Sequence, residues 1–275
     1  MKYDTPALRY PRLQDLTHQF QPIESAATGG AEWHEALVRW RLPDGTVRGP
    51  LDVLPFWLSP TRSDTFTRFT VTRAAAALLD APGSRLSINL SPSQVTQPSA
   101  LHALRTLKPE LQGRLVVELT EQQIHNLDAY WQGLESLRGD CAMVLLDDVT
   151  FDDLDLRFRK GAPIDGIKLD RSLLPALLGG TYHQRAVDLV QDARERFDIV
   201  VAEGVEDPTA RDHLAGLGVT HLQGFGIGRP VARIPQSRNA SAARAGAHPG
   251  APHPKPVGNA PELRLPADGS NVHND

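Results

Sequence analysis

Short apolar runs alternate with longer amphipathic segments along most of the chain, and this alternation limits the fold more than any other feature. The apolar runs have the length of buried strands, while the longer segments repeat apolar residues every three or four positions, as helices do. A chain that alternates strand and helix forms a parallel sheet covered by helices, either an open doubly wound sheet or a closed barrel. The strand-like runs are residues 86–90, 115–119, 143–146, 164–169, 199–202 and 219–227. The helix-like segments are residues 66–79, 127–138, 182–197 and 209–218.

The number of units favours the closed barrel. No glycine-rich phosphate-binding fingerprint follows the first strand, which argues against a dinucleotide-binding sheet. Seven or eight strand–helix units in one domain are typical of an α/β protein of the TIM (β/α)8 type, and we predict that this domain covers residues 1–235. Residues 236–275 contain six prolines and no Phe, Trp or Tyr, so we predict a disordered tail there.

The composition restricts the partners of the chain. With 29 Lys and Arg against 33 Asp and Glu, the formal net charge is −4 at pH 7, so no broad basic surface is available for DNA or RNA. No apolar run approaches the roughly 20 residues of a membrane span, and the N-terminal residues lack the apolar stretch of a signal peptide. We therefore expect a soluble, cytoplasmic protein with no membrane and no nucleic-acid partner.

Polar side chains stand at or near the carboxyl ends of five strand-like runs. A barrel brings these strand ends together at one rim, where such folds carry their active sites. Because side chains alternate faces along a strand, Glu118, Asp147 and Lys168 can point toward one interior. A single carboxylate after a strand is more often a helix cap or a solvated loop residue, but five runs that end alike indicate a site. The residues are Asn89, Glu118, Asp147, Asp148, Lys168, Asp170 and Glu203.

The segment EWHEALVRW, residues 32–40, adds a carboxylate and a guanidinium. Strand alternation places Glu35 and Arg39 on the same face, where both could point toward the site. A surface ion pair on an edge strand is an equally good interpretation of these two residues.

The candidate residues are carboxylates, one carboxamide and one lysine, without a histidine cluster or a cysteine. Hard oxygen ligands of this kind favour Mg²⁺ or Mn²⁺ over zinc. The adjacent Asp147 and Asp148 could hold two ions, with one carboxylate bridging them, for in-line displacement at a phosphate ester. An enolase-type barrel, which uses carboxylate-held Mg²⁺ with a lysine base, is an alternative that the residues alone leave open.

Eight motifs, in order along the chain, resemble the EAL-domain family of cyclic di-GMP phosphodiesterases. The resemblance covers essentially the whole predicted barrel domain. It implies a modified TIM barrel of the EAL type that hydrolyses cyclic di-GMP to linear pGpG with Mg²⁺ or Mn²⁺. The motifs are FQPI (residues 20–23), EALVRW (35–40), INLS (88–91), ELTE (118–121), LLDD (145–148), PIDGIKLDRSLL (163–174), VVAEGVED (200–207) and LQGFGIGRPV (222–231).

The resemblance also implies a role for each matching residue. Two metal ions are expected, with Asp147 a ligand of both. Lys168 is expected to orient or deprotonate the attacking water, and Gln223 to help position it. The first ion would be held by Glu35, Asn89, Glu118 and Asp147, and the second by Asp147, Asp148 and Glu203. Substrate contacts are expected from Gln21, Leu37 and Arg39, and supporting roles from Glu121, Asp170 and Glu206.

Two segments depart from the family pattern. The family usually continues FGTGYSSL after the two aspartates, whereas this chain has VTFDDLDL at residues 149–156. Thr150 and Asp152 replace the two glycines, so any positive φ at these positions would be costly, and three carboxylates are added near the proposed metals. Residues 50–64 lack the family's FIPLAEExGLI pattern, which is expected to affect a helix and a rim but no proposed ligand.

The altered loop leaves three functions open. The complete ligand set favours an active phosphodiesterase whose partner is cyclic di-GMP. A loop that disables catalysis would instead leave a cyclic di-GMP receptor or a regulator that binds another protein. Retention of every metal ligand argues against the last alternative, because a binding scaffold has no need for buried, mutually repelling carboxylates. The family often dimerises around this loop, so the resemblance is compatible with a homodimer.

Overall fold

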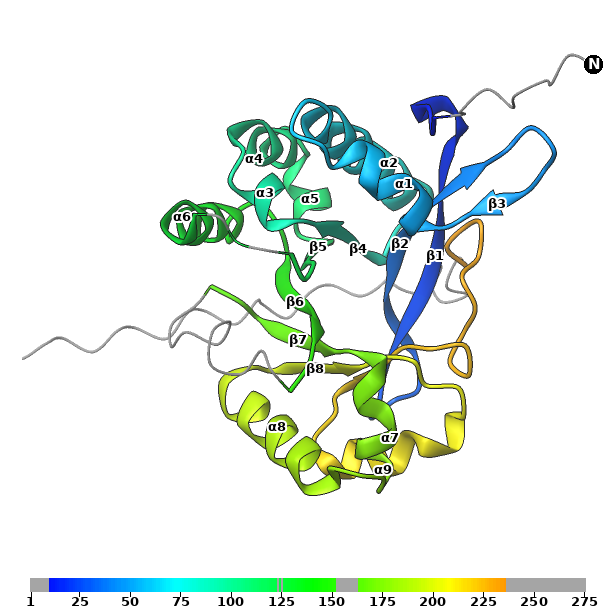
Figure 1. The fold of residues 1–275 in the computed structure, drawn as a ribbon, viewed down its shortest axis with the longest axis vertical. Helices are drawn as coiled ribbons and strands as arrows, with labels where there is room; N and C mark the ends of the chain where they lie inside the picture. The colour runs from blue at the N-terminus through cyan, green and yellow to red at the C-terminus, as the bar shows by residue number, and fades with distance from the viewer. Residues whose placement is uncertain (1–9, 123, 125, 152–162, 236–275) are drawn as a thin grey trace, which may run out of the picture. The chain divides into compact units, whose positions relative to one another are not determined.

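The computed structural model describes residues 10–122, 124, 126–151 and 163–235 (Figure 1). These residues belong to one compact unit, Met1–Arg238. The predicted tail, residues 236–275, and most of the altered loop, from Asp152 onward, lie outside the described residues.

Eight strands close into a barrel, as the alternation of strand and helix predicts. Seven of them run parallel to one another, and β1 closes the ring by pairing antiparallel with both β2 and β9. This reversed strand makes the fold a modified TIM barrel. The short strand β3 (Val47–Arg48) pairs with the far end of β2 outside the ring. In ring order the strands are β1 (Leu16–Ser25), β9 (His221–Leu222), β8 (Ile199–Ala202), β7 (Gly166–Leu169), β6 (Met143–Val149), β5 (Leu115–Leu119), β4 (Arg85–Leu90) and β2 (Ala31–Arg41).

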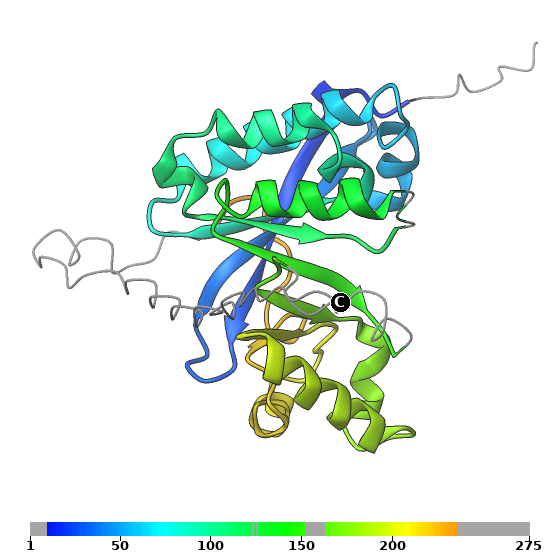
Figure 2. The same cartoon turned by 90° about the vertical axis from the view of Figure 1, so that its left-hand side faces the viewer.

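The helices surround the strands in two groups. The first six lie together on one side of the strands and the last three on the other (Figures 1 and 2). Side chains fix where several of them begin: Ser91 and Gln94 form a capping box at α3, and Asn126 accepts a hydrogen bond from the backbone N–H of Ala129 at the start of α6. The helices are α1 (Pro50–Trp57), α2 (Ser63–Asp80), α3 (Pro92–Val95), α4 (Pro98–Arg105), α5 (Pro109–Gln112), α6 (Leu127–Leu137), α7 (Leu174–Leu177), α8 (His183–Arg196) and α9 (Arg211–Leu217).

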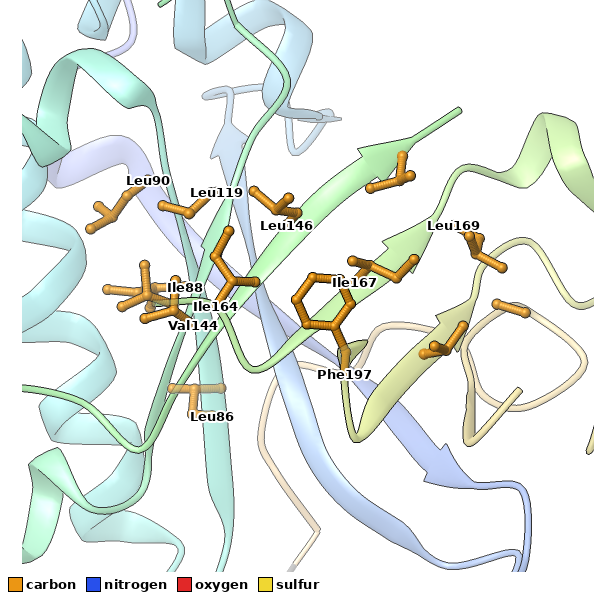
Figure 3. Close-up of a cluster of buried hydrophobic side chains, with 14 of the residues drawn as sticks. Leu86, Ile88, Leu90, Leu119, Val144, Leu146, Ile164, Ile167, Leu169 and Phe197 are labelled. Atoms are coloured by element: carbon orange, nitrogen blue, oxygen red, sulfur yellow. The ribbon is translucent and has the colours of Figure 1, made fainter. Parts of the chain in front are cut away.

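Two apolar layers stabilise the barrel. The outer layer lies between strands and helices and includes side chains such as Ile88, Leu146 and Ile167, which Figure 3 labels. The inner layer fills the barrel interior with five buried side chains. Five of the eight strands, β1, β2, β5, β6 and β8, therefore have an apolar interior position in this layer. The next interior position toward the carboxyl end of a parallel strand is two residues further along. The inner layer consists of Ile23, Trp33, Val116, Leu145 and Val201.

The predicted strands at residues 115–119 and 199–202 are confirmed with the same bounds. The run at residues 219–227 is much too long as a strand, because β9 contains only His221–Leu222. The chain turns after β9, where a Cβ atom on Gly224 would overlap the backbone of Val205. The first strand, β1, is missing from the predicted runs because its interior face carries the polar Gln21.

In the described part of the chain, none of the helices is both long enough and apolar enough to span a membrane.

Candidate active site

The interior positions above the apolar layer form a polar ring at the carboxyl ends of the strands. On β2, β5 and β6, the step from Trp33, Val116 and Leu145 leads two residues on to Glu35, Glu118 and Asp147. These three carboxylates are at most 7% exposed, although a carboxylate normally stays in water. Such buried charges need compensation, which indicates a functional arrangement. The ring also contains Asn89, Lys168, Glu203 and Gln223.

Lys168 is the centre of this ring. Its side chain is 1% exposed, and its Nζ lies 2.6 Å from Glu203, 2.9 Å from Asp147 and 3.0 Å from Glu118. A fourth carboxylate oxygen, on Glu35, lies 3.5 Å away. Burial alone would lower the pKa of Lys168, but the four carboxylates override it and raise this pKa well above its ordinary value.

Glu35 is held by two carboxamides as well as by the lysine. Asn89 Nδ2 donates to Glu35 Oε1 at 2.7 Å, and Gln223 Nε2 donates to Glu35 Oε2 at 2.7 Å. Burial opposes ionisation of this group, but the charge of Lys168 and these hydrogen bonds hold the pKa of Glu35 below its usual value. The side chain of Glu35 is therefore ionised before any cation binds.

A bulge in β6 brings both aspartates into the site. The pairing register between β6 and β7 shifts between Leu146 and Val149, and Asp148 adopts a positive φ of 52°. Strict alternation would send Asp148 away from the interior, whereas a bulge can turn two successive side chains to one side. A non-glycine residue with this backbone is uncommon, and such conformations cluster at functional sites.

Two groups of carboxylates could each hold a metal ion, and Asp147 belongs to both. Within each group, one oxygen per residue lies within 4.8 Å of the others. Within this ring, Asn89 Oδ1, Glu118 Oε1 and Gln223 Oε1 are buried and have no hydrogen-bond partner among the described residues. Buried oxygens without partners, beside clustered carboxylates, fit a hard divalent cation. The groups are Glu35 with Glu118 and Asp147, and Asp147 with Asp148 and Glu203.

Metal binding is expected to strengthen as the pH rises to about 8. Burial raises the pKa of Glu203 to about 8. The charge of Lys168 opposes this shift, and the charges of Asp147 and Glu35 add to it. Burial and then the charge of Asp147 raise the pKa of Asp148 to about 6. A cation must displace these protons before it can bind. At pH 6.5, protonation of Glu203 alone should therefore weaken the apparent affinity for the cation roughly 30-fold relative to alkaline pH.

Isothermal titration with Mn²⁺ at pH 6.5 and 8.5, in buffers of different ionisation enthalpy, measures both the affinity and the protons released. We expect more protons to be released at pH 6.5. Equal proton release at the two pH values would contradict the raised pKa of Glu203.

A cleft of about 860 Å³ opens above the carboxylates. Gln21 and Leu37, two of the predicted substrate contacts, line it, and Gln21 Nε2 donates to the carbonyl of Gly228. Arg39 is half-buried, and its Nε donates to Gln19 Oε1 at 2.8 Å. The cleft also has lining residues that the sequence analysis did not single out: Arg171, Ser172, Leu174, Pro175, Leu178, Gly204, Gly224 and Phe225. All of these follow Lys168, Glu203 or Gln223 by one to ten positions, and this proximity to a predicted site residue is the signal that could have found them.

The predicted supporting residues lie around the site. Asp170 caps the short helix Arg171–Leu173 by accepting from the backbone N–H of Ser172. Glu121 is exposed, and its charge helps to raise the pKa of Asp148. Glu206 lines the cleft. Thr150 does not adopt a positive φ, so the expected strain is absent at this position, while Asp152 lies outside the described residues.

Comparisons of the sequence point to one family. The family model of the EAL domain matches residues 7–230. An uncharacterized signaling protein of Caulobacter vibrioides is 32% identical over 233 residues, which cover 79% of this chain and 28% of that protein. The probable cyclic di-GMP phosphodiesterase PdeG of Escherichia coli is 27% identical over 225 residues, which cover 78% of this chain and 44% of that protein. The chain therefore spans less than half the length of these relatives.

Solved structures agree with this assignment. The PaMucR phosphodiesterase in its c-di-GMP complex has a TM-score of 0.66 at 25% identity, over 79% of this chain and 97% of that one. An EAL domain protein from Listeria monocytogenes shares the fold with a TM-score of 0.68 at 22% identity, over 79% and 89% of the two chains. By the matching family model, the barrel and its ring of carboxylates, the chain belongs to the EAL domain family.

Proposed function

We propose that the chain is a metal-dependent phosphodiesterase that hydrolyses cyclic di-GMP to linear pGpG. Water adds to one phosphorus, the P–O3′ bond breaks, and the products are a 5′-phosphate and a free 3′-hydroxyl in one linear dinucleotide. The observation that carries the proposal is the pair of carboxylate groups that share Asp147 at the floor of the cleft. The names of PdeG and of the PaMucR phosphodiesterase support the same substrate.

Two ions, Mg²⁺ or Mn²⁺, fit the donors of the site. Glu35, Asn89, Glu118 and Asp147 would hold one of them, and Asp147, Asp148 and Glu203 the other. When bound, the ions would make water more acidic and offset the negative charge of the phosphate. Their positive charge also explains how an anionic dinucleotide could enter a cleft rich in carboxylates.

The chain's own residues would orient the reactants. The high pKa of Lys168 keeps its ammonium protonated at neutral pH in the metal-free site, so we assign it to orienting the water rather than to removing a proton. Gln223, which directly follows β9, donates to Glu35 and would help to position the water. Gln21, Leu37 and Arg39 would contact the dinucleotide. A cytoplasmic location and a homodimer stay predictions of the sequence.

The proposed function is tested by incubating purified protein with cyclic di-GMP and Mg²⁺ or Mn²⁺ and following pGpG by chromatography. We expect metal-dependent product from the unmutated protein and none from Glu35→Ala. Glu110→Ala, at an exposed position on α5, is the matched control and should retain full activity. Binding of cyclic di-GMP without product would make the chain a receptor, and absence of both would refute the nucleotide function.

A further inference from the structure

The barrel wall is open beside the candidate metal ligands. β2 and β4 pair at only three positions, the last of which joins Glu35 to Ser87. Beyond this point β2 continues to Arg41, while Asn89 and Leu90 of β4 pair only with β5. The two strands therefore separate at the level where their side chains reach the site.

A cavity of about 210 Å³ occupies this opening, and we call it the slot. Its lining includes candidate metal ligands, among them Asn89 and Asp147. The lining also includes Pro50 and Leu54 of α1 and Thr70 of α2. Pro50 and Leu54 belong to residues 50–64, the segment expected to affect a helix and a rim but no proposed ligand, and they line the same cavity as the ligands. The slot leads from the site toward the outer helical layer.

His18 borders a second cavity as well. This outer pocket measures about 590 Å³ and lies between β1, α2 and residues 232–234, with Arg73 and Asp80 among its lining residues. His18 therefore lines both the slot and the outer pocket. The imidazole is 6% exposed and stacks on Phe69, with ring centroids 5.7 Å apart.

Two buried polar atoms that border the slot need water as a hydrogen-bond partner. Among the described residues, His18 Nδ1 and Thr120 Oγ1 have no hydrogen-bond partner. Burial, with the charges of Arg73 and Arg39, lowers the pKa of His18 to about 4, so at neutral pH one ring nitrogen donates and the other accepts. A polar cavity of this volume has room for several waters at about 30 Å³ each, and such waters usually satisfy groups of this kind.

We propose that the slot and the outer pocket form a second route for water to the site, and that His18 and Thr120 carry water through the barrel wall. The inference rests on the proposed hydrolase function, which consumes one water in every turnover. The cleft and the slot share Glu35, Leu37, Asp147 and Asp148. A dinucleotide in the cleft would cover the direct approach, while the slot reaches the same carboxylates from behind. His18 and Thr120 are positioning residues for water and do not touch the substrate.

The first test removes the polar atom from the slot while keeping the side-chain shape. Thr120→Val should lower kcat about fivefold, the equivalent of one hydrogen bond, and leave KM and Mn²⁺ affinity unchanged. His18→Phe should lower kcat in the same way. Thr72→Val on the exposed face of α2 and His102→Phe on α4 are the matched controls, and both should retain the original kcat. Unchanged kcat in Thr120→Val and His18→Phe, or a rise in KM alone, would overturn the proposal.

The second test is independent of turnover. A high-resolution crystal structure should contain ordered waters that contact Thr120 Oγ1 and His18 Nδ1, and the water at residue 120 should be lost in Thr120→Val. A slot without water would overturn the proposal. Absence of pGpG from the unmutated protein would instead refute the proposed function, and the catalytic role of the route with it, even where the slot is hydrated.

Discussion

Asp147→Asn is expected to abolish hydrolysis of cyclic di-GMP, with kcat reduced about a thousandfold or more, as for loss of a main stabiliser of transition-state charge. Asp147 is the only residue common to both metal-holding groups of the described chain. Its Oδ1 also lies 2.9 Å from Lys168 Nζ. A single substitution therefore weakens both candidate cation sites and releases one contact of the lysine. A substitution in a residue of only one group would leave the other candidate cation site intact.

The measurement is kcat at saturating Mn²⁺ together with the number of Mn²⁺ ions bound per chain. Asp192→Asn, at an exposed position on α8, is the control and should behave as the unmutated protein. The fold should survive Asp147→Asn. Burial raises the pKa of Asp147, which means that the folded protein disfavours its negative charge, and the substitution removes that charge. Full turnover in Asp147→Asn would contradict the assignment of a shared ligand.

Much of the barrel can be predicted from the sequence, because its parallel strands are continuous apolar runs. Residues 115–119 are buried on both faces and can be recognised from composition alone. β1 cannot be recognised in this way, since its interior face supplies Gln21 to the site and its outer face supplies His18 to the outer pocket. The strand pairs with β2 across the short turn at residues 26–30, a contact that composition alone does not reveal.

The carboxylates of the site could also be predicted, since they follow apolar interior positions at a spacing of two. The position of Asp148 could not, because it depends on a bulge and a positive φ that strict alternation does not give. The slot could not be predicted from the sequence either. It results from the point at which β2 and β4 stop pairing, and His18 reaches it from β1, the strand that pairs with β2 on its other side.

Lys168→Met is expected to destabilise the metal-free protein by about 3–5 kcal/mol, the usual cost of leaving buried charges without their partner. Methionine keeps most of the side-chain volume but removes the ammonium that lies within 3.5 Å of four carboxylates. Loss of the ammonium raises the folded-state pKa values of these carboxylates, and the carboxylates can respond by taking up protons. Groups with raised pKa values bind more protons in the folded state than in the unfolded state, so stability falls as the pH increases through this range.

The loss in Lys168→Met should therefore be larger at pH 8.5 than at pH 6, and Mg²⁺ or Mn²⁺ should restore much of it, because divalent cations replace the missing charge. Urea unfolding with and without Mg²⁺ at the two pH values measures both effects. Lys108→Met, at an exposed position before α5, is the matched control and should show neither. The lysine and the cations would then be alternative partners for one set of carboxylates: Lys168 holds the ring together in the metal-free protein, and its ammonium becomes available to orient water when the cations bind. A stability loss in Lys168→Met that is independent of both pH and Mg²⁺ would contradict this exchange and reduce Lys168 to a packing residue.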